Sequence, residues 1–151
     1  YLVVIYQPED PSMSWDMDVI GSIKPDQLVS VSLADIDSDG DFDAFVGSYS
    51  LGSRDKDDES SENQALGSVA WFENTKLGWK KNNVLRRKRG MYDKWIPLDI
   101  DEDGDTDFVG TRGNSKPYDG VIWLEQIRSE EPLPVFKQAR IKDSISIPFV
   151  D

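Results

Sequence analysis

The chain has 151 residues, a length that suits one domain of ordinary size. It contains neither Cys nor His, which excludes disulfides, thiolate and imidazole metal sites, and catalytic triads or dyads built on His. The formal net charge is -12, but eleven of the 29 acidic residues fall in two short segments, which leaves 18 against 17 basic residues. The acidity is therefore local, which suits cation binding and speaks against a nucleic-acid partner.

The residues given predict neither a membrane span nor an export signal. No apolar run approaches the ~18 residues that a membrane span requires, so we expect no membrane span. The chain begins with Tyr1 instead of Met, and no signal peptide is present. We therefore expect a mature product, an excised segment or a fragment of a longer chain.

In chain order, the first predicted strand covers residues 3–7, which read Val-Val-Ile-Tyr-Gln. Residues 29–33, Val-Ser-Val-Ser-Leu, alternate with a period of two, which predicts a half-buried strand. Residues 43–47, Asp-Ala-Phe-Val-Gly, form an apolar run that is more typical of a strand covered on both faces.

An acidic segment separates the last two of these strands. It places Asp at every other position from 35 to 43 and Gly40 at the sixth place, and it recurs at residues 99–107 with Gly104 at the sixth place. We call these segments the first and second Asp loops. Neighbouring carboxylates repel one another unless a cation lies among them, and Ca2+ takes about six to eight oxygen ligands. The two loops therefore predict two calcium sites.

The spacing assigns a role to each loop position. The carboxylates at the first, third and fifth positions would point at the ion, and glycine at the sixth permits the sharp turn because it has no Cβ. The seventh residue, Asp41 or Asp105, would offer its backbone carbonyl, and the ninth, Asp43 or Asp107, would close the coordination shell.

Three alternatives compete with this interpretation. An EF-hand needs a bidentate Glu at the twelfth position and flanking helices, whereas Val46 and Gly110 stand there and the flanks resemble strands. A metal-free turn is the second alternative, because Asp and Gly are common in turns. Mg2+ is the third, and it is disfavoured because it keeps several waters. We favour Ca2+ in a structural role that ties two strands together.

A shift of 64 residues that superimposes the two Asp loops also places Trp15 on Trp79. After each loop comes a similar Trp-containing strand, Val-Ala-Trp-Phe-Glu-Asn at residues 69–74 and Val-Ile-Trp-Leu-Glu-Gln at residues 121–126. The opening strand at residues 3–7 resembles a third copy. The sequence is therefore an array of repeats.

Variable loops precede the two Trp-containing strands, a long polar one at residues 50–66 and a shorter one at residues 111–119. Such loops are where repeat folds place binding. The last residues, 145–151, resemble the approach to the second Asp loop at residues 95–99. Asp151 would then be the first ligand of a third loop, with the spacing off by one residue.

Each repeat holds a strand, an Asp loop, a strand, a variable loop, a Trp-containing strand and a strand near Trp79. Four strands per repeat, stacked radially, is the arrangement of a β-propeller. We therefore expect an all-β fold of four-stranded antiparallel blades with an incomplete ring, in which only residues 86–90 could form a helical turn. The predicted divisions of this one propeller portion are 1–28 for the end of one blade, 29–92 for a repeat with the first Asp loop, 93–142 for a repeat with the second, and 143–151 for the start of another.

The Asp-x-Asp-x-Asp-Gly-x-x-Asp loop, the Gly-x-Val-x-Trp-Phe-Glu-Asn strand and the repeat length resemble the FG-GAP/VCBS repeat family, which occurs in integrin α-subunit propellers and in many bacterial secreted and surface proteins. The resemblance covers about residues 3–147. It implies a β-propeller, usually of seven blades, with Ca2+ in the loop between the first two strands of a blade. Carried onto this sequence, it implies as ligands Asp35, Asp37, Asp39, Asp41, Asp43, Asp99, Asp101, Asp103, Asp105 and Asp107.

The resemblance also implies a location and a role. We expect a calcium-stabilised extracellular module, secreted or on a cell surface, that serves binding, adhesion or structural assembly. Its partners would be other blades, from the rest of a parent chain or from neighbouring chains, and a glycan or protein ligand. The alternative is the propeller part of a secreted polysaccharide-degrading enzyme. Nothing else in the sequence suggests catalysis, so we expect no enzyme activity of its own.

A few further residues are candidates for a ligand surface. The basic cluster at residues 86–89 could contact a polyanion, although a solvated strand face explains it more simply. Trp71 and Trp123 recur at one position of the repeat, which favours packing between blades over stacking on sugar rings. Tyr118 and Trp95 are not repeated, so they are the better candidates for ligand contact.

Overall fold

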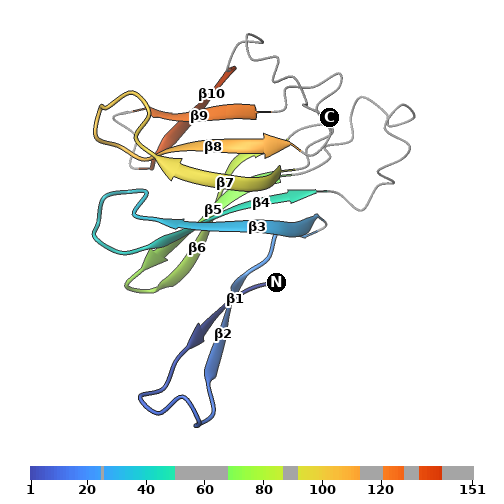
Figure 1. Ribbon diagram of the computed structural model, residues 1–151, viewed down its shortest axis with the longest axis vertical. Coiled ribbons are helices and arrows are strands. Elements are labelled where there is room, and N and C mark those ends of the chain that lie inside the picture. The colour runs from blue at the N-terminus through green and yellow to red at the C-terminus, as the bar shows by residue number, and fades with distance from the viewer. Residues whose placement is uncertain (25, 50–67, 87–91, 113–120, 128–132, 141–151) are drawn as a thin grey trace, which may run out of the picture.

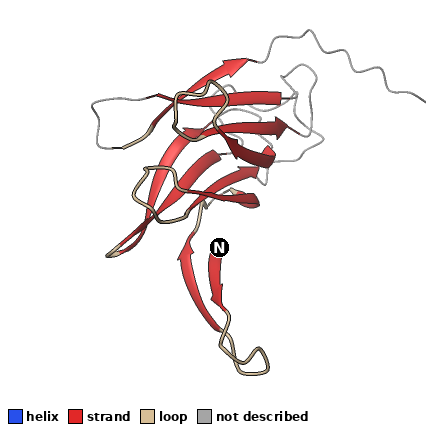
Figure 2. Ribbon diagram, turned by 60° about the vertical axis from the view of Figure 1, so that its left-hand side comes forward, coloured by secondary structure: helices blue, strands red, loops and turns tan. Residues whose placement is uncertain are grey.

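A computed structural model describes residues 1–24, 26–49, 68–86, 92–112, 121–127 and 133–140 (Figure 1). Within these ranges the chain forms strands, loops and turns without any helix, so the predicted all-β class is confirmed (Figure 2). In the same ranges, accordingly, no helix is long and apolar enough to cross a membrane. Several predicted features lie outside the described residues, namely the loop at 50–66, Tyr118 with most of the loop at 111–119, the basic cluster after Arg86, and Asp151 with the strand before it.

Ten strands are present in the described part of the chain, and they include all the strands expected around the Asp loops and the tryptophans. Their bounds are β1 Leu2–Tyr6, β2 Asp16–Gly21, β3 Gln27–Ala34, β4 Asp43–Tyr49, β5 Ser68–Thr75, β6 Gly78–Arg86, β7 Tyr92–Leu98, β8 Asp107–Arg112, β9 Val121–Ile127 and β10 Val135–Arg140.

The strands form three antiparallel sheets in which neighbours in sequence are neighbours in space. Strands β3 to β6 form sheet 1, strands β7 to β10 form sheet 2, and β1 pairs with β2 in a two-stranded sheet that we call the hairpin. Figure 1 shows the hairpin, sheet 1 and sheet 2 following one another along the molecule, with β7 lying against β3 and β4. The chain thus builds one sheet after another from consecutive residues.

The two four-stranded sheets have the same register. In sheet 1, Phe45 lies opposite Ser32 on one side and Trp71 on the other. In sheet 2, Val109 lies opposite Ile96 and Trp123 in the same way. Residues opposite one another share a face of the sheet, so the internal repeat of the sequence is also a repeat of the structure.

Strand β3 alternates as expected, but its serine side is the buried one. Ser30 and Ser32 are buried, whereas Val29, Val31 and Leu33 are exposed. The buried side faces sheet 2, where the Ser32 hydroxyl donates a hydrogen bond to the backbone carbonyl of Trp95. The exposed side lies toward the hairpin, which has two strands and leaves β3 uncovered. Strand β4 is covered on both faces, as its apolar run predicted.

The main hydrophobic core lies between sheet 1 and sheet 2. The buried members that sheet 1 contributes include Phe45, Val69 and Trp71, and those of sheet 2 include Trp95 and Phe108. Burial of Trp71 agrees with the expected packing between blades. The suggestion that Trp95 contacts a ligand is wrong, because its side chain has no exposed surface. Its ring packs over Gly110, the residue opposite it in β8.

A second core cluster joins the other face of sheet 1 to the hairpin. Ala44, Val46, Ala70 and Phe72 are buried there, with Leu2, Ile20 and Trp79 packed against them at partial exposure. Gly21 lets the hairpin approach closely, because a Cβ at that position would lie 2.0 Å from the Phe72 ring. The central strands of sheet 1, β4 and most of β5, are therefore covered on both faces, whereas β3 is covered on one.

Sheet 2 has one face covered by sheet 1 and one open face that no other sheet in the described part of the chain covers. The open face, which we call the outer face, is lined by the row Ile96, Val109 and Trp123 together with Leu98 and Val121. Ile96 is 51% exposed and Val121 41%, whereas Trp71 and Val69, the residues of sheet 1 that match Trp123 and Val121, are buried under sheet 2.

Candidate metal centre

The two Asp loops connect matching strands at the same end of neighbouring sheets. The first links β3 to β4 and the second links β7 to β8, and both project from the left side of the molecule in Figure 1. This placement follows from the register: Ala34 pairs with Asp43 and Leu98 pairs with Asp107, so each loop closes the first antiparallel pair of strands in its sheet. The helical flanks that an EF-hand needs are not found here, since both flanks are strands.

The backbones of the two loops bend in the same way. Ser38 and Glu102, at the fourth loop position, both have φ of 63°. Gly40 and Gly104, at the sixth, have φ of 96° and 90°. Left-handed backbone is tolerated best by glycine, which explains the glycine in both loops. The residue at the fourth position is also left-handed, although it carries a side chain. Each loop therefore turns through two left-handed residues.

Carboxylates at the first position hold each loop together. The two oxygens of Asp35 accept hydrogen bonds from the backbone N–H groups of Asp39 at 3.1 Å and Gly40 at 3.1 Å. Asp99 accepts equivalent bonds from Asp103 at 3.1 Å and Gly104 at 3.0 Å. These bonds satisfy the N–H groups of a tight turn and curl the chain around the carboxylates.

Three carboxylates converge in each loop, but the third member differs. In the first loop, oxygens of Asp35, Asp37 and Asp39 lie within 4.8 Å of one another. In the second loop the converging group is Asp99, Asp101 and Asp107. Since Ca–O distances are about 2.3–2.6 Å, one ion can bridge oxygens up to roughly 5 Å apart. Both groups therefore have the separation that a single Ca2+ between them requires.

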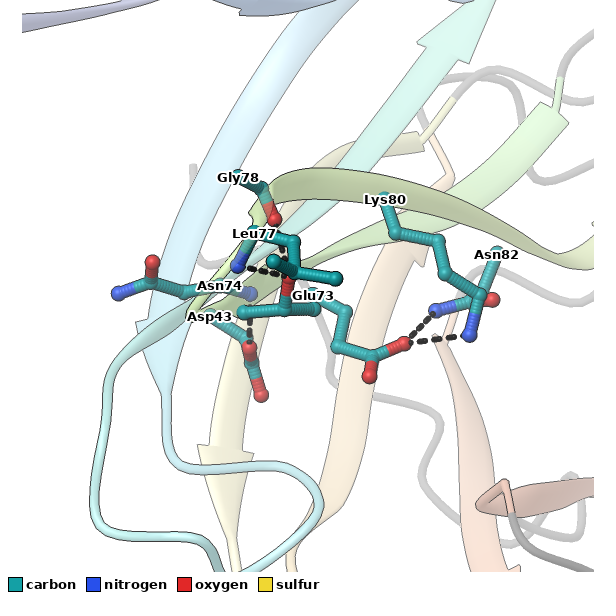
Figure 3. Close-up of polar contacts among 8 residues, drawn as sticks. Asp43, Glu73, Asn74, Leu77, Gly78, Lys80 and Asn82 are labelled. Carbon is teal, nitrogen blue, oxygen red and sulfur yellow. Dashed lines mark hydrogen bonds and ion pairs between the residues drawn. The ribbon is translucent and has the colours of Figure 1, made fainter.

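Asp43 and Asp107, at the ninth position, tie each loop to the Trp-containing strand. Asp43 has no exposed surface and accepts a hydrogen bond from the backbone N–H of Ile36 at 3.0 Å. It accepts a second from the backbone N–H of Asn74 at 2.8 Å (Figure 3). Asp107 repeats this pattern with the N–H groups of Ile100 at 3.1 Å and Gln126 at 2.8 Å. Each of these carboxylates thus connects the start of its loop, the second strand and the third strand.

The seventh position distinguishes the two loops. Asp41 is exposed in the first loop, whereas Asp105 is 9% exposed in the second and neither of its carboxyl oxygens has a hydrogen-bond partner within the described part of the chain. Burial, and then the charge of Asp103, raises the pKa of Asp105 to about 6. A buried carboxylate without donors is costly, and a cation beside it would remove that cost.

Three further carboxylates of the loops, those of Asp37, Asp43 and Asp101, also have raised pKa values. Burial raises the pKa of Asp43 to about 6, although the backbone hydrogen bonds from Asn74 and Ile36 act in the opposite direction. Burial, followed by the charge of Asp39, raises the pKa of Asp37. Burial and the charges of Asp103 and Asp107 raise that of Asp101. In both loops, burial and then the charge of neighbouring carboxylates thus make the ionised form of these groups less favourable.

One Glu beside each loop was not identified from the sequence as part of the site. Glu73 and Glu125 stand at the same place in β5 and β9, and each adds to the upward shift of an Asp pKa in its loop, at Asp37 and Asp101. Lys80 Nζ lies 2.9 Å from a carboxyl oxygen of Glu73, which also accepts a hydrogen bond from Asn82 (Figure 3). The signal available in the sequence was the Glu that follows Trp-x in both strands.

Two side chains, one in the second Asp loop and one in sheet 2, form hydrogen bonds to the first loop. Gln126 Nε2 donates a hydrogen bond of 3.1 Å to the backbone carbonyl of Ile36, and Thr106 Oγ1 donates one of 3.3 Å to that of Asp35. The two candidate metal groups are therefore mechanically connected. Sequence reasoning did not identify either residue, because nothing local to Gln126 or Thr106 marks such a contact.

Comparison with known proteins identifies no relative: no family model, no curated protein and no solved structure matches this chain. The site is therefore interpreted from its own chemistry. It presents oxygen donors only, in a chain without His or Cys, which suits Ca2+, Mg2+ or Mn2+ and not Zn2+ or Cu2+.

Proposed function

We propose that the chain is a calcium-binding structural unit of an extracellular β-propeller, in which one Ca2+ in each Asp loop fixes the turn between the first two strands of a blade. The observation that carries the proposal is the repeated geometry of the loops. The same backbone conformation, the same carboxylate-to-backbone hydrogen bonds and a converging group of three carboxylates occur twice, at equivalent places in two sheets. An accidental acidic turn would have no reason to repeat in this detail.

Three observations support a Ca2+ ion in the Asp loops. The donors are all oxygens, the separation of the converging oxygens suits Ca–O distances, and Asp105 keeps a buried carboxylate for which the described residues supply no donor. Extracellular Ca2+ is near millimolar, which fills sites with dissociation constants of about 10⁻⁴–10⁻³ M. The ion's role in this proposal is structural: it neutralises the loop and locks the turn.

The propeller is supported by how the sheets follow one another. Two four-stranded meanders with identical register pack face to face, preceded by a hairpin that packs on sheet 1 as sheet 1 packs on sheet 2. The outer face of sheet 2 matches a face of sheet 1 that is buried. We therefore propose that its partner is another sheet of the same kind. The resemblance to the FG-GAP/VCBS family supports the same architecture, the extracellular location and a role in adhesion or assembly without catalysis.

Calcium titration by isothermal calorimetry tests the metal sites. Metal-free protein should bind two Ca2+ ions, and Asp37→Ala and Asp101→Ala should each remove one of them. Asp41→Ala is the matched control, because Asp41 is exposed and the substitution retains the backbone carbonyl that would face the ion. Absence of binding at ten millimolar Ca2+, or binding that survives both substitutions together, would refute the proposal.

Sedimentation velocity tests the partner of the outer face. In solutions of this chain alone, a partner sheet must come from another copy, so we expect concentration-dependent association that Ile96→Lys reduces. Leu77→Lys is the control, because Leu77 is fully exposed at the turn between β5 and β6 and lies away from the outer face. A chain that stays monomeric at all concentrations with the outer face intact would count against a sheet as its partner.

A further inference from the structure

The first Asp loop is fixed from outside its own sheet. The carbonyls of its first two residues, Asp35 and Ile36, accept hydrogen bonds from Thr106 of the second Asp loop and from Gln126 of sheet 2. Ile36 is fully buried and Gln126 is 8% exposed, so the bond between them is shielded from water. The backbone N–H of Ile36 donates a hydrogen bond to the Asp43 carboxylate, so both backbone polar groups of Ile36 are held.

This arrangement positions the residue that begins the candidate metal group. Asp35 supplies the first converging carboxylate, and its own backbone carbonyl is the acceptor of the Thr106 hydroxyl. Ordering a flexible loop around an ion costs conformational entropy. A loop whose first two residues are already held by a neighbouring sheet pays less of that entropy when the ion binds, so its affinity is higher.

We propose that Gln126 and Thr106 are positioning residues for the first cation site, so that cation binding there and the packing of sheet 2 on sheet 1 stabilise each other. This inference rests on the proposed function, since it requires a cation in the loop. Thermodynamic linkage makes the effect reciprocal. The free energy by which sheet 2 strengthens cation binding in the first loop equals the free energy by which the bound cation stabilises the contact between the sheets. The cation would then strengthen the contact between sheets as well as the turn.

The second Asp loop provides the internal comparison. Its corresponding carbonyls, those of Asp99 and Ile100, lie in the loop between β7 and β8 of sheet 2, beyond which the described part of the chain has no further sheet. Among the residues that the structure describes, therefore, no neighbouring sheet holds the second loop in this way. Substitutions of Gln126 and Thr106 should for this reason act on the first site, although Thr106 itself lies in the second loop.

A matched control exists because the two sheets repeat. Asn74 occupies in β5 the place that Gln126 occupies in β9, and the backbone N–H of each bonds to the ninth-position Asp of its own loop. Leucine at either position keeps this backbone bond. Gln126→Leu removes the bond between the sheets, whereas Asn74→Leu tests the general effect of an apolar side chain at that place.

Calorimetric titration with Ca2+ in two backgrounds tests the inference. In Asp101→Ala, where the first loop alone is intact, Gln126→Leu and Thr106→Val should each raise the Ca2+ dissociation constant by about three- to tenfold, the size of one net hydrogen bond. Thr106→Ser, which keeps the hydroxyl, and Asn74→Leu should leave it unchanged. In Asp37→Ala, where the second loop alone is intact, Gln126→Leu should also have no effect.

Hydrogen exchange provides a second readout that a folding defect alone would not reproduce. In Asp101→Ala, saturating Ca2+ should slow amide exchange in β9, and Gln126→Leu should abolish this slowing while Asn74→Leu preserves it. Equal Ca2+ affinity in the parent, Gln126→Leu and Thr106→Val would overturn the coupling and leave the proposed function intact, as would equal weakening of both sites. Absence of Ca2+ binding in the wild type would instead overturn the proposed function, and the coupling with it.

Discussion

The rings of Phe45 and Phe108 stack across the two four-stranded sheets, with centroids 3.6 Å apart and planes 9° from parallel. Trp95 meets Phe45 edge-on at 5.4 Å, and Phe136 approaches Phe45 and Phe108 from the side at 5.8 Å and 5.9 Å. Four aromatic rings from β4, β7, β8 and β10 thus form the centre of the contact between the sheets. This contact is packed as the interior of one folding unit.

Truncating either ring should therefore destabilise the whole chain. We expect Phe45→Ala or Phe108→Ala to lower the free energy of unfolding by about 3–5 kcal/mol, because each leaves a cavity in the main core. Phe42→Ala, at a side chain that is 67% exposed in the first Asp loop, should change it by less than about 0.5 kcal/mol. Urea denaturation measures all three, and equal effects of Phe42→Ala and Phe108→Ala would contradict the described packing.

Trp95 and Gly110 fit each other, so a larger residue at position 110 should be tolerated only when a smaller one replaces Trp95. A Cβ on Gly110 would lie 2.3 Å from the Trp95 ring, so we expect Gly110→Val to destabilise by about 3 kcal/mol or more. The same register position in sheet 1 holds Val31 opposite Val46. Trp95→Val in the Gly110→Val background should recover part of the loss, since it recreates that pair. Melting temperatures of the single and double variants would show whether the rescue occurs.

The ninth-position aspartates should matter for folding even without metal. Asn in place of Asp43 keeps one acceptor oxygen and introduces an NH2 group facing a backbone N–H, so one of the two bonds to Ile36 and Asn74 is lost. We expect Asp43→Asn to cost about 1–3 kcal/mol in metal-free protein, measured by urea denaturation. Asp41→Asn, at an exposed position, is the comparison. If Asp43→Asn left the free energy of unfolding unchanged, the two hydrogen bonds of this carboxylate would not be needed to hold the loop to its strands.

Acid should stabilise the metal-free protein. The pKa values of Asp43 and Asp105 are about 6 in the folded state, above the ~3.9 of an unperturbed Asp. The folded state therefore binds more protons than the unfolded state between pH ~4 and ~6, and stability is lost as the pH rises through 6. Each carboxyl contributes at most about 2–3 kcal/mol. Unfolding of metal-free protein should need more urea at pH 5 than at pH 7, with a smaller difference in Asp105→Asn.

Calcium should reverse this pH dependence. The ion competes with protons for the same carboxylates, so its stabilising effect should be largest above pH 6 and should shrink below it. Urea curves with saturating Ca2+ at pH 5 and pH 7 would measure this. A metal-free protein that loses stability on going from pH 7 to pH 5 would contradict the raised pKa values on which the expectation depends.

Local patterns in the sequence were sufficient for much of the fold. The alternation at residues 29–33, the apolar run at residues 43–47 and the Trp-containing segments each became a strand. The spacing of the aspartates also located both loops, because ligand spacing and the left-handed residue at Gly40 and Gly104 are local properties.

Other features depend on which surfaces meet, and no local pattern encodes that. Trp95 resembled a surface residue because it is not repeated, yet its ring fills the space over Gly110. The serine side of β3 is buried because sheet 2 covers it and supplies an acceptor at Trp95. The contact of Gln126 with Ile36 joins residues 90 positions apart. These are consequences of packing one sheet on the next.

The most direct test of the central claim is thermal unfolding in saturating Ca2+ against excess chelator at neutral pH. Two sites occupied at 10- to 100-fold their dissociation constant would add about 3–5 kcal/mol, so chelation should lower the melting temperature by on the order of 10 °C, and adding back Ca2+ should restore it. An unchanged melting temperature in chelator would contradict a structural role for calcium in the Asp loops.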